Sequence, residues 1–315
     1  MARLAHLPRP PSESLLDQWR RSINKRFGRP ATPNVAVLAS MLVALRDAST
    51  TALGTPNDRV AVTYPTVLTK LTDVDVTDAL DYANLRPWLG AEPAEPHNDA
   101  GMNPSRLSEA CTVAASHGLG LCSNFKDLFE CWEEEQRMPT HTVLLAGLTR
   151  RDLRAEVVQL RAPFHWYQTT VAQFVDLEAG TDAMDRFPSP TYFWRHVRKQ
   201  VQSWVGGLPT RLTQVMLVGE NATEPGFLAV LKDALLDYGH SPGGIEGQIL
   251  LQDNQGNQET MDPVFASARG SAQYARWRQE APIGCKERKV CEEKRERSRR
   301  EGLLQKLNSE RVDLR

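Results

Sequence analysis

A glycine loop between an apolar segment and an amphipathic segment is the first place where the sequence could support chemistry. The segment Val215–Leu235 reads VMLVGENATEPGFLAVLKDAL, with Gly219 at the end of the apolar run and Pro225 at the start of the amphipathic stretch. A loop of this type looks like a phosphate or nucleotide loop. A glycine between a strand and a helix is also common as a purely structural turn, so both interpretations stay open at this point.

Cysteine is the second residue type that could do chemistry. The five cysteines form two local pairs, Cys122 with Cys131 and Cys285 with Cys291, and leave Cys111 over. They lack the CxxC pairing of a structural zinc site. In a reducing compartment we expect thiols. The two local pairs could be disulfides if the chain belongs to a secreted lineage.

Histidine beside cysteine could form a metal site. His117 lies close in sequence to Cys111 and Cys122, but the spacing matches no standard metal-binding pattern. A buried histidine with buried thiols is the commoner arrangement. We therefore predict no metal site. The aromatic run Phe164–Tyr167 could line a pocket, although a core cluster is the commoner role.

The composition is that of an ordinary soluble globular protein, with 41% hydrophobic residues, 24% charged residues and a net charge of −1. This balance favours neither nucleic acid nor a membrane as a partner. The N-terminus lacks the apolar run of a signal peptide, and we expect no membrane-spanning segment. The sequence therefore predicts a cytoplasmic location, with the nucleus as the alternative through the basic tail.

Helices and strands are expected to alternate along the chain, which predicts an α/β fold. Apolar residues at helical spacing predict helices, the first of them buried, at Asn34–Gly54, Asp75–Trp88, Arg106–Leu121, Ser189–Val205 and Asp262–Gln279. Alternation and β-branched residues predict strands at Arg59–Pro65, His141–Leu148 and Leu153–Arg161, the last two as a hairpin. The glycine loop then connects a further strand to a further helix.

Four segments, in this order, resemble the nucleotide-binding domain of the heat-shock-70 chaperones, part of the actin-like ATPase superfamily. They read VAVTYP with the following DALDYANLRPW, SEACTVAASHGLG, VMLVGENATEPGFLAVL and DPVFASARGSAQYA. Glu109 and Gly118 keep the separation that they have in the family. Gly219 and Pro225 match the family's adenosine motif, and Gly270 is in register with its closing helix.

The resemblance implies an actin-like ATPase (ribonuclease H-like) two-lobed α/β fold, with an incomplete first lobe and a reduced outer part of the second lobe. It divides the chain into an N-terminal arm (1–31), a remnant of the first lobe (32–140), a second lobe with the adenosine-type motif (141–261), a closing helix (262–284) and a charged C-terminal tail (285–315).

The departures from the family concern the residues that meet the triphosphate. Two hairpins normally supply aspartates and glycines, so that backbone N–H groups and Mg²⁺ can bind the phosphates. In the second hairpin the leading aspartate falls on Leu145, and only Gly147 and Asp152 remain. In the adenosine motif the second glycine is Glu220 and the arginine is Thr223. The comparison therefore predicts that ATPase chemistry is lost.

The resemblance implies ATP or ADP with Mg²⁺ as the cofactor class, and it implies no catalytic and no metal-binding residue in this chain. The candidate nucleotide-binding residues are Gly219, Glu220, Asn221, Thr223, Gly147 and Glu109.

The predicted function is that of a pseudo-ATPase that acts as a binding scaffold for an unknown protein partner. A first alternative is an ATP-binding protein or ATPase with a truncated gene model, because no Asp-x-Gly hairpin precedes Asn34. A second alternative is a nucleic-acid-associated protein acting through the basic run KRERSRR (294–300), although interspersed acids favour a solvated helix or arm. No membrane partner is expected.

Overall fold

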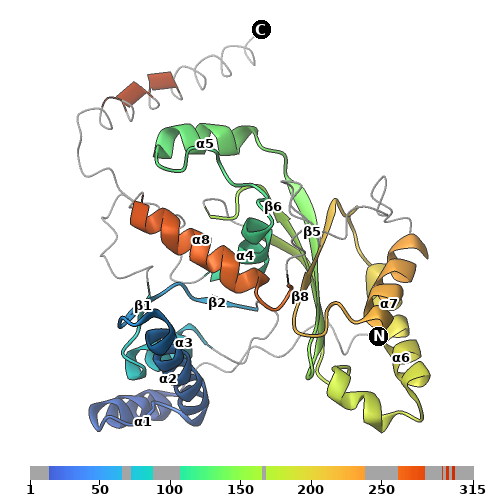
Figure 1. Ribbon diagram of the computed structural model, residues 1–315, viewed down its shortest axis with the longest axis horizontal. Helices are drawn as coiled ribbons and strands as arrows, with labels where there is room; N and C mark the ends of the chain where they lie inside the picture. The colour runs from blue at the N-terminus through green and yellow to red at the C-terminus, as the bar shows by residue number, and fades with distance from the viewer. Residues whose placement is uncertain are drawn as a thin grey trace.

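The centre of the structure is a four-stranded sheet in the order β7-β6-β5-β8 (Figure 1). Its strands are β5 His141–Leu148, β6 Leu153–Leu160, β7 Thr169–Asp176 and β8 Gln214–Val218. Strand β6 is antiparallel to both of its neighbours, β5 and β7, whereas β8 runs parallel to β5. The β5–β6 hairpin and the α/β class predicted from the sequence are confirmed.

In this computed structural model, the described residues are 14–65, 72–87, 107–164, 168–237 and 262–280, with residues 293, 296, 297, 300 and 301 of the C-terminal segment. Residues 238–261, most of the tail after residue 280 and part of the aromatic run at 164–167 lie outside these residues. The five predicted segments of the chain stay predictions.

Strand β5 is buried on both of its faces. Its successive side chains point to opposite sides of the sheet, and each side packs into a hydrophobic cluster. Leu144, Ala146 and Leu148 belong to one hydrophobic cluster, which includes side chains of the helices after β7. Val143 and Leu145 belong to a second cluster on the opposite face. This explains why β5 reads as a nearly continuous apolar run rather than an alternating one.

Helices α6 (Pro190–Val205) and α7 (Pro225–Asp237) cover one face of the sheet (Figure 1). A short 3₁₀ helix, η1 (Thr181–Arg186), leads from β7 into α6. Phe193 of α6 is fully buried against the sheet. The two helices approach closely because Gly226 lies against the ring of Trp194, where a Cβ atom would clash. Ser189 precedes α6 and forms no side-chain cap hydrogen bond.

Helices α4 (Glu109–Ser116) and α8 (Ala266–Glu280) lie on the other face of the sheet and pack against each other (Figure 1). Gly270 makes the contact possible, because a Cβ atom there would overlap the backbone of Thr112. The Ser267 hydroxyl lies 2.9 Å from that of Thr112 and 3.2 Å from that of Thr63. The segments SEACTVAASHGLG and DPVFASARGSAQYA are therefore neighbours in space.

Three helices and two small parallel strand pairs form the N-terminal part. The helices are α1 Leu15–Arg26, α2 Pro33–Leu53 and α3 Asp73–Tyr82, and the strands are β1 Arg59–Val60, β2 Thr63–Tyr64, β3 Arg86–Pro87 and β4 Leu107–Ser108. β1 pairs with β3, and β2 pairs with β4. The buried guanidinium of Arg21 joins α1 to α3 through Asp75 at 2.9 Å and Asp78 at 2.5 Å.

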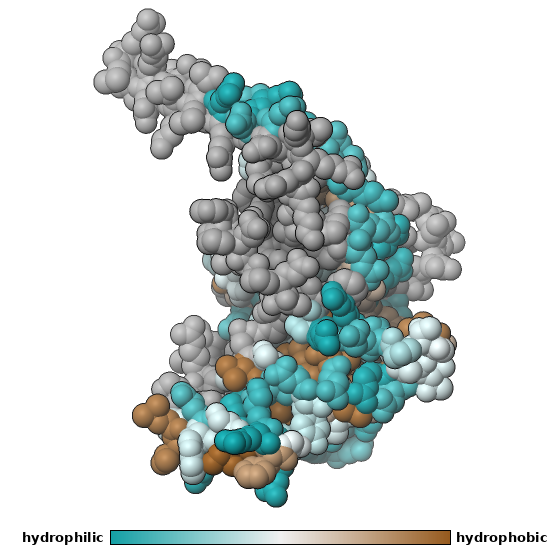
Figure 2. Space-filling view, turned by 90° about the vertical axis from the view of Figure 1, so that its left-hand side faces the viewer, coloured by the Kyte–Doolittle hydropathy of each residue, from teal (hydrophilic) through white to brown (hydrophobic). Residues whose placement is uncertain are grey.

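Helix α2 is present as predicted, but the expectation that it is buried is wrong. Only Val35 and Ala39 are buried, whereas Val37, Met41 and Leu45 are 64%, 59% and 62% exposed. Figure 2 shows hydrophobic residues on the lower part of the molecule, where the N-terminal helices lie. In the described part of the chain, α2 is also the one helix long and apolar enough to cross a membrane, by length and composition alone. The expectation that no segment spans a membrane stays a prediction.

Several element boundaries differ from the sequence predictions. The strand predicted at Arg59–Pro65 is two separate two-residue strands, and the helix predicted to reach Trp88 ends at Tyr82. The helix predicted over Arg106–Leu121 spans only α4. Strand β7 and helix α5 (Leu128–Arg137) were not predicted.

Candidate functional site

The glycine loop after β8 is held by backbone hydrogen bonds to its neighbours. Gly219 has φ +104°, and a Cβ atom there would lie 2.7 Å from the carbonyl oxygen of Leu148. The Asn221 N–H donates to that same carbonyl at 3.1 Å, and the Asn221 side-chain amide donates to Thr181 Oγ1 at 2.8 Å. Only glycine fits the first position, because the backbone conformation and the close approach both exclude a side chain.

The turn between β5 and β6 lies beside this loop. The hydroxyl of Thr149 organises it by accepting from the N–H groups of Arg151 and Asp152, at 3.1 Å and 3.0 Å, and donating to the Asp152 carboxylate at 2.8 Å. Gly147 lies within β5, opposite Arg154 on β6, and its missing side chain leaves room for the Arg154 stem. Its position is explained by strand packing.

Glu220 connects the glycine loop to the β5–β6 turn. Its exposed carboxylate accepts a hydrogen bond from the backbone N–H of Arg150 at 2.9 Å. The side chain of Arg150 turns to Asp182, at 3.0 Å, and Arg151 lies 3.4 Å from the same carboxylate. The turn therefore presents its N–H group to a carboxylate of the chain itself, and its two arginines are paired at the surface.

Glu109 belongs to a buried charge cluster on the α4 face of the sheet. Its Oε1 accepts from Arg154 Nη2 at 2.9 Å, and Arg154 Nη1 donates to Asp152 at 3.1 Å. Burial raises the pKa of Glu109, the Arg154 guanidinium opposes that rise, and the nearby Glu156 and Asp152 add to it. A single guanidinium thus faces several carboxylates.

The pocket at this cluster is small. It is lined by Glu109, Leu145, Arg154, Ala155, Glu156 and Val218, and its cavity volume is about 0 Å³, so that it has no room even for a water molecule. Pockets for drug-sized ligands usually measure about 300–1,000 Å³. The arrangement can hold an ion-paired arginine, but it does not offer the space of a nucleotide site.

The structure brings some of the predicted site residues together and separates others. Gly219, Glu220 and Asn221 lie at the β5–β6 turn, whereas Glu109 lies in the charge cluster and Thr223 is exposed to solvent. Sequence analysis did not identify Arg154. The strand register, which places Arg154 opposite Gly147, would have been the signal.

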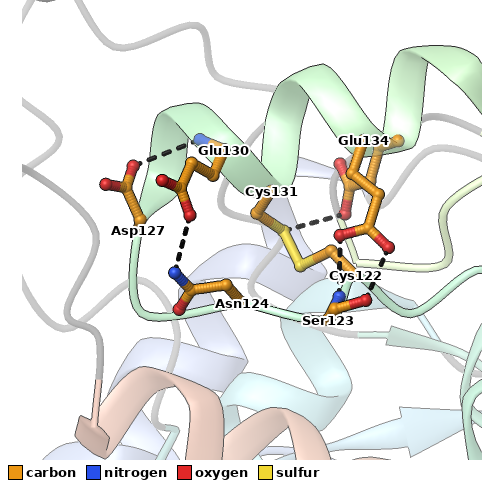
Figure 3. Close-up of a disulfide and its surroundings, with 8 residues drawn as sticks. Cys122, Ser123, Asn124, Asp127, Glu130, Cys131 and Glu134 are labelled. Carbon is orange, nitrogen blue, oxygen red and sulfur yellow. Dashed lines mark hydrogen bonds between the residues drawn. A yellow bond between two sulfur atoms is a disulfide. The ribbon is translucent and has the colours of Figure 1, made fainter.

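The cysteines take two different environments. Cys122 and Cys131 form a disulfide, one of the two pairs left open by the sequence, and Cys111 is free and buried (Figure 3). Burial raises the pKa of Cys111 to about 11, so this thiol is unreactive at neutral pH. Cys285 and Cys291 lie outside the described residues. His117 is buried, as predicted.

Among the described residues, His117 and Cys111 belong to no group of potential metal ligands, whereas Cys122, Cys131 and Glu135 do. Glu135 is a residue that sequence analysis did not identify. The sequence matches no protein-family model and no curated protein, so the interpretation of the site rests on its geometry.

Proposed function

We propose that this chain is a degenerate nucleotide-binding-domain protein of the heat-shock-70 and actin-like type, which has lost ATPase chemistry and acts as a binding scaffold. The observation that carries the proposal is the hydrogen bond from the Arg150 N–H to the Glu220 carboxylate. In the proposed fold this N–H belongs to a phosphate-binding hairpin. A carboxylate of the chain takes the position of the phosphate.

Topology supports the proposed fold. Three antiparallel strands, followed by a helix and a fourth strand parallel to the first, are the arrangement of a ribonuclease H-like lobe, and β5 to β8 follow it. The contact between α4 and α8, closed by Gly270, joins two of the four segments on which the resemblance rests. An incomplete first lobe and a reduced outer part of the second lobe belong to this proposal.

The chemistry of the cleft supports the loss of activity. Phosphoryl transfer needs positioned cations and donors around the γ-phosphate. Leu145, at the place of the hairpin aspartate, is buried against α4 and cannot bind a cation. Glu109 is already bound to Arg154, and the carboxylate of Glu220 would repel a polyphosphate chain.

A titration with Mg-ATP and with Mg-ADP tests the proposal. A ligand at about 100 times its Kd stabilises a fold by about 2.7 kcal/mol, so even a site of modest affinity raises Tm at millimolar nucleotide. We expect the Tm of the wild-type chain, and of Glu224→Gln as an exposed carboxylate control, to stay constant. A concentration-dependent rise in the Tm of the wild type would refute the proposal and favour the ATP-binding alternative.

A further inference from the structure

Three metal-binding side chains converge beneath helix α5. Cys131 and Glu135 are four residues apart on α5, so they share one face of the helix, and Cys122 approaches from the preceding loop. The potential ligand atoms lie within 4.8 Å of one another. The distance from Cys131 Sγ to Glu135 Oε1 is 3.5 Å.

The burial of Glu135 is the unusual part of this cluster. Glu135 and Cys131 are 0% exposed and Cys122 is 5% exposed. The two cysteines belong to a hydrophobic cluster with Phe164, Tyr274 and other apolar residues. The hydrophobic shell around the three side chains would keep bulk water away from a bound ion, as it does around metal sites in proteins.

We propose that Cys122, Cys131 and Glu135 form a zinc site when the disulfide is reduced, with water as the fourth ligand. Two thiolates and a carboxylate are ligands that Zn²⁺ accepts in tetrahedral geometry. Bond lengths of about 2.3 Å to sulfur and about 2.1 Å to oxygen place neighbouring sulfur and oxygen ligands about 3.6 Å apart. The observed separation of Cys131 Sγ and Glu135 Oε1 is 3.5 Å, which is within 0.1 Å of this value.

Only the two sulfur atoms have to move. Tetrahedral zinc holds two sulfur ligands about 3.8 Å apart, so Cys122 and Cys131 must separate when their bond is broken. Their Cα atoms are 5.2 Å apart. The loop after Cys122 can supply the movement, because Ser123 and Asn124 are exposed and water can replace their hydrogen bonds to Glu134 and Glu130 on α5 (Figure 3).

The reaction balances with an external dithiol or phosphine as reductant. The sulfur–sulfur bond takes up two electrons and two protons and becomes two thiols, while a dithiol leaves as its own disulfide or a phosphine as its oxide, with oxygen from water. Zn²⁺ then binds both sulfurs and releases the two thiol protons to solvent. The two thiolate charges offset that of the ion, so the formal charge of the buried site equals that of the disulfide form with an ionised Glu135.

Cobalt absorption tests the site in the full-length chain. Cys285→Ser and Cys291→Ser remove the other cysteine pair, and the chain is reduced with a phosphine without oxygen. We expect Co²⁺ to give thiolate charge-transfer absorption with the intense bands of a tetrahedral ion, at one ion per chain, and Zn²⁺ to abolish them. The unreduced chain is expected to give neither the thiolate charge-transfer absorption nor the bands of a tetrahedral ion.

Glu135→Gln and Glu133→Gln are matched variants, because the second carboxylate lies on the same helix but pairs with Arg137 at the surface. We expect Glu135→Gln to weaken Co²⁺ binding at least about tenfold and Glu133→Gln to leave it unchanged. Protection of Cys122 and Cys131 from alkylation by Zn²⁺ gives a second readout in the chain that keeps Glu135. Absence of the charge-transfer band, equal affinities of the two variants, or alkylation unaffected by Zn²⁺ would overturn the proposal.

Discussion

The carboxylate of Glu220 accepts a hydrogen bond from the backbone N–H of Arg150, and this contact joins the loop after β8 to the turn after β5. The two segments are 70 residues apart in the chain. They meet because β8 pairs in parallel with β5, which brings the ends of both strands to the same edge of the sheet. The contact is therefore a consequence of sheet topology.

Replacing Glu220 should cost little stability. An exposed hydrogen bond is partly replaced by water, so we expect Glu220→Ala to lower the free energy of unfolding by about 0.5–1 kcal/mol. Urea denaturation measures this change. Glu224→Ala removes a second exposed glutamate of the same loop and should change the free energy of unfolding by less than about 0.5 kcal/mol. Equal effects of the two substitutions would show that the Glu220 contact does not hold the loops together.

Replacing Gly219 should cost much more. Gly219→Ala would place a Cβ atom 2.7 Å from the Leu148 carbonyl oxygen at φ +104°, and strain of this kind costs about 1–3 kcal/mol. Gly207 is the control, because its Cβ atom would meet ordinary contacts of 3.5 Å or more. We expect a clear loss in Tm for Gly219→Ala only. A similar Tm for both variants would contradict the strained turn.

Local sequence signals identified the elements around this turn. The β5–β6 hairpin is short, strongly apolar and closed by polar turn residues, so its prediction needed no knowledge of distant contacts. The strand–glycine–helix unit was predicted for the same reason. Strand β7 was missed because it lies at one end of the strand order and six of its eight residues are partly or fully exposed.

Burial and side-chain clusters depend on tertiary contacts that local patterns do not contain. Helix α2 is apolar around most of its circumference, so its sequence does not tell which side is covered. The pairing of Glu109 with Arg154 joins residues 45 positions apart. It becomes visible only once the register of β5 and β6 places Arg154 opposite Gly147.

Arg154 should be essential for the charge cluster. Arg154→Met leaves Glu109, Asp152 and Glu156 together without their guanidinium, and breaking a buried ion pair costs about 3–5 kcal/mol. Arg151→Met removes an exposed arginine of the β5–β6 turn and should lower the free energy of unfolding by less than about 1 kcal/mol. Chemical denaturation of both variants at neutral pH measures the difference. A mild effect of Arg154→Met would show that the cluster does not depend on this cation.

The pH dependence of stability should report the raised pKa of Glu109. The pKa of Glu109 is higher in the folded state than in the unfolded state, where it is near 4.5. The folded state therefore binds this proton more tightly. Stability from this group is therefore present below pH 4.5 and is lost as the pH rises through the higher folded pKa. Glu109→Gln removes this titration.

The measurement is the free energy of unfolding of wild type and Glu109→Gln across the acid-to-neutral range. The difference in the free energy of unfolding should shift in favour of the glutamine variant as the pH rises, because only the wild type must ionise the buried carboxyl group at position 109. Glu224→Gln should follow the wild type. A pH-independent difference between wild type and Glu109→Gln would contradict a raised pKa at Glu109.

The two faces of α2 should respond differently to the same substitution. Ala39 is fully buried in a cluster with Val35, Ala31 and Ala79 of α3, whereas Ala44 is exposed on the same helix. Ala39→Glu would bury a carboxylate between α2 and α3, with a cost of several kcal/mol. Ala44→Glu should change the free energy of unfolding by less than about 0.5 kcal/mol and should increase solubility, because it interrupts the exposed apolar residues Met41 and Leu45. Similar destabilisation by both substitutions would mean that the outer face of α2 is covered in the folded protein.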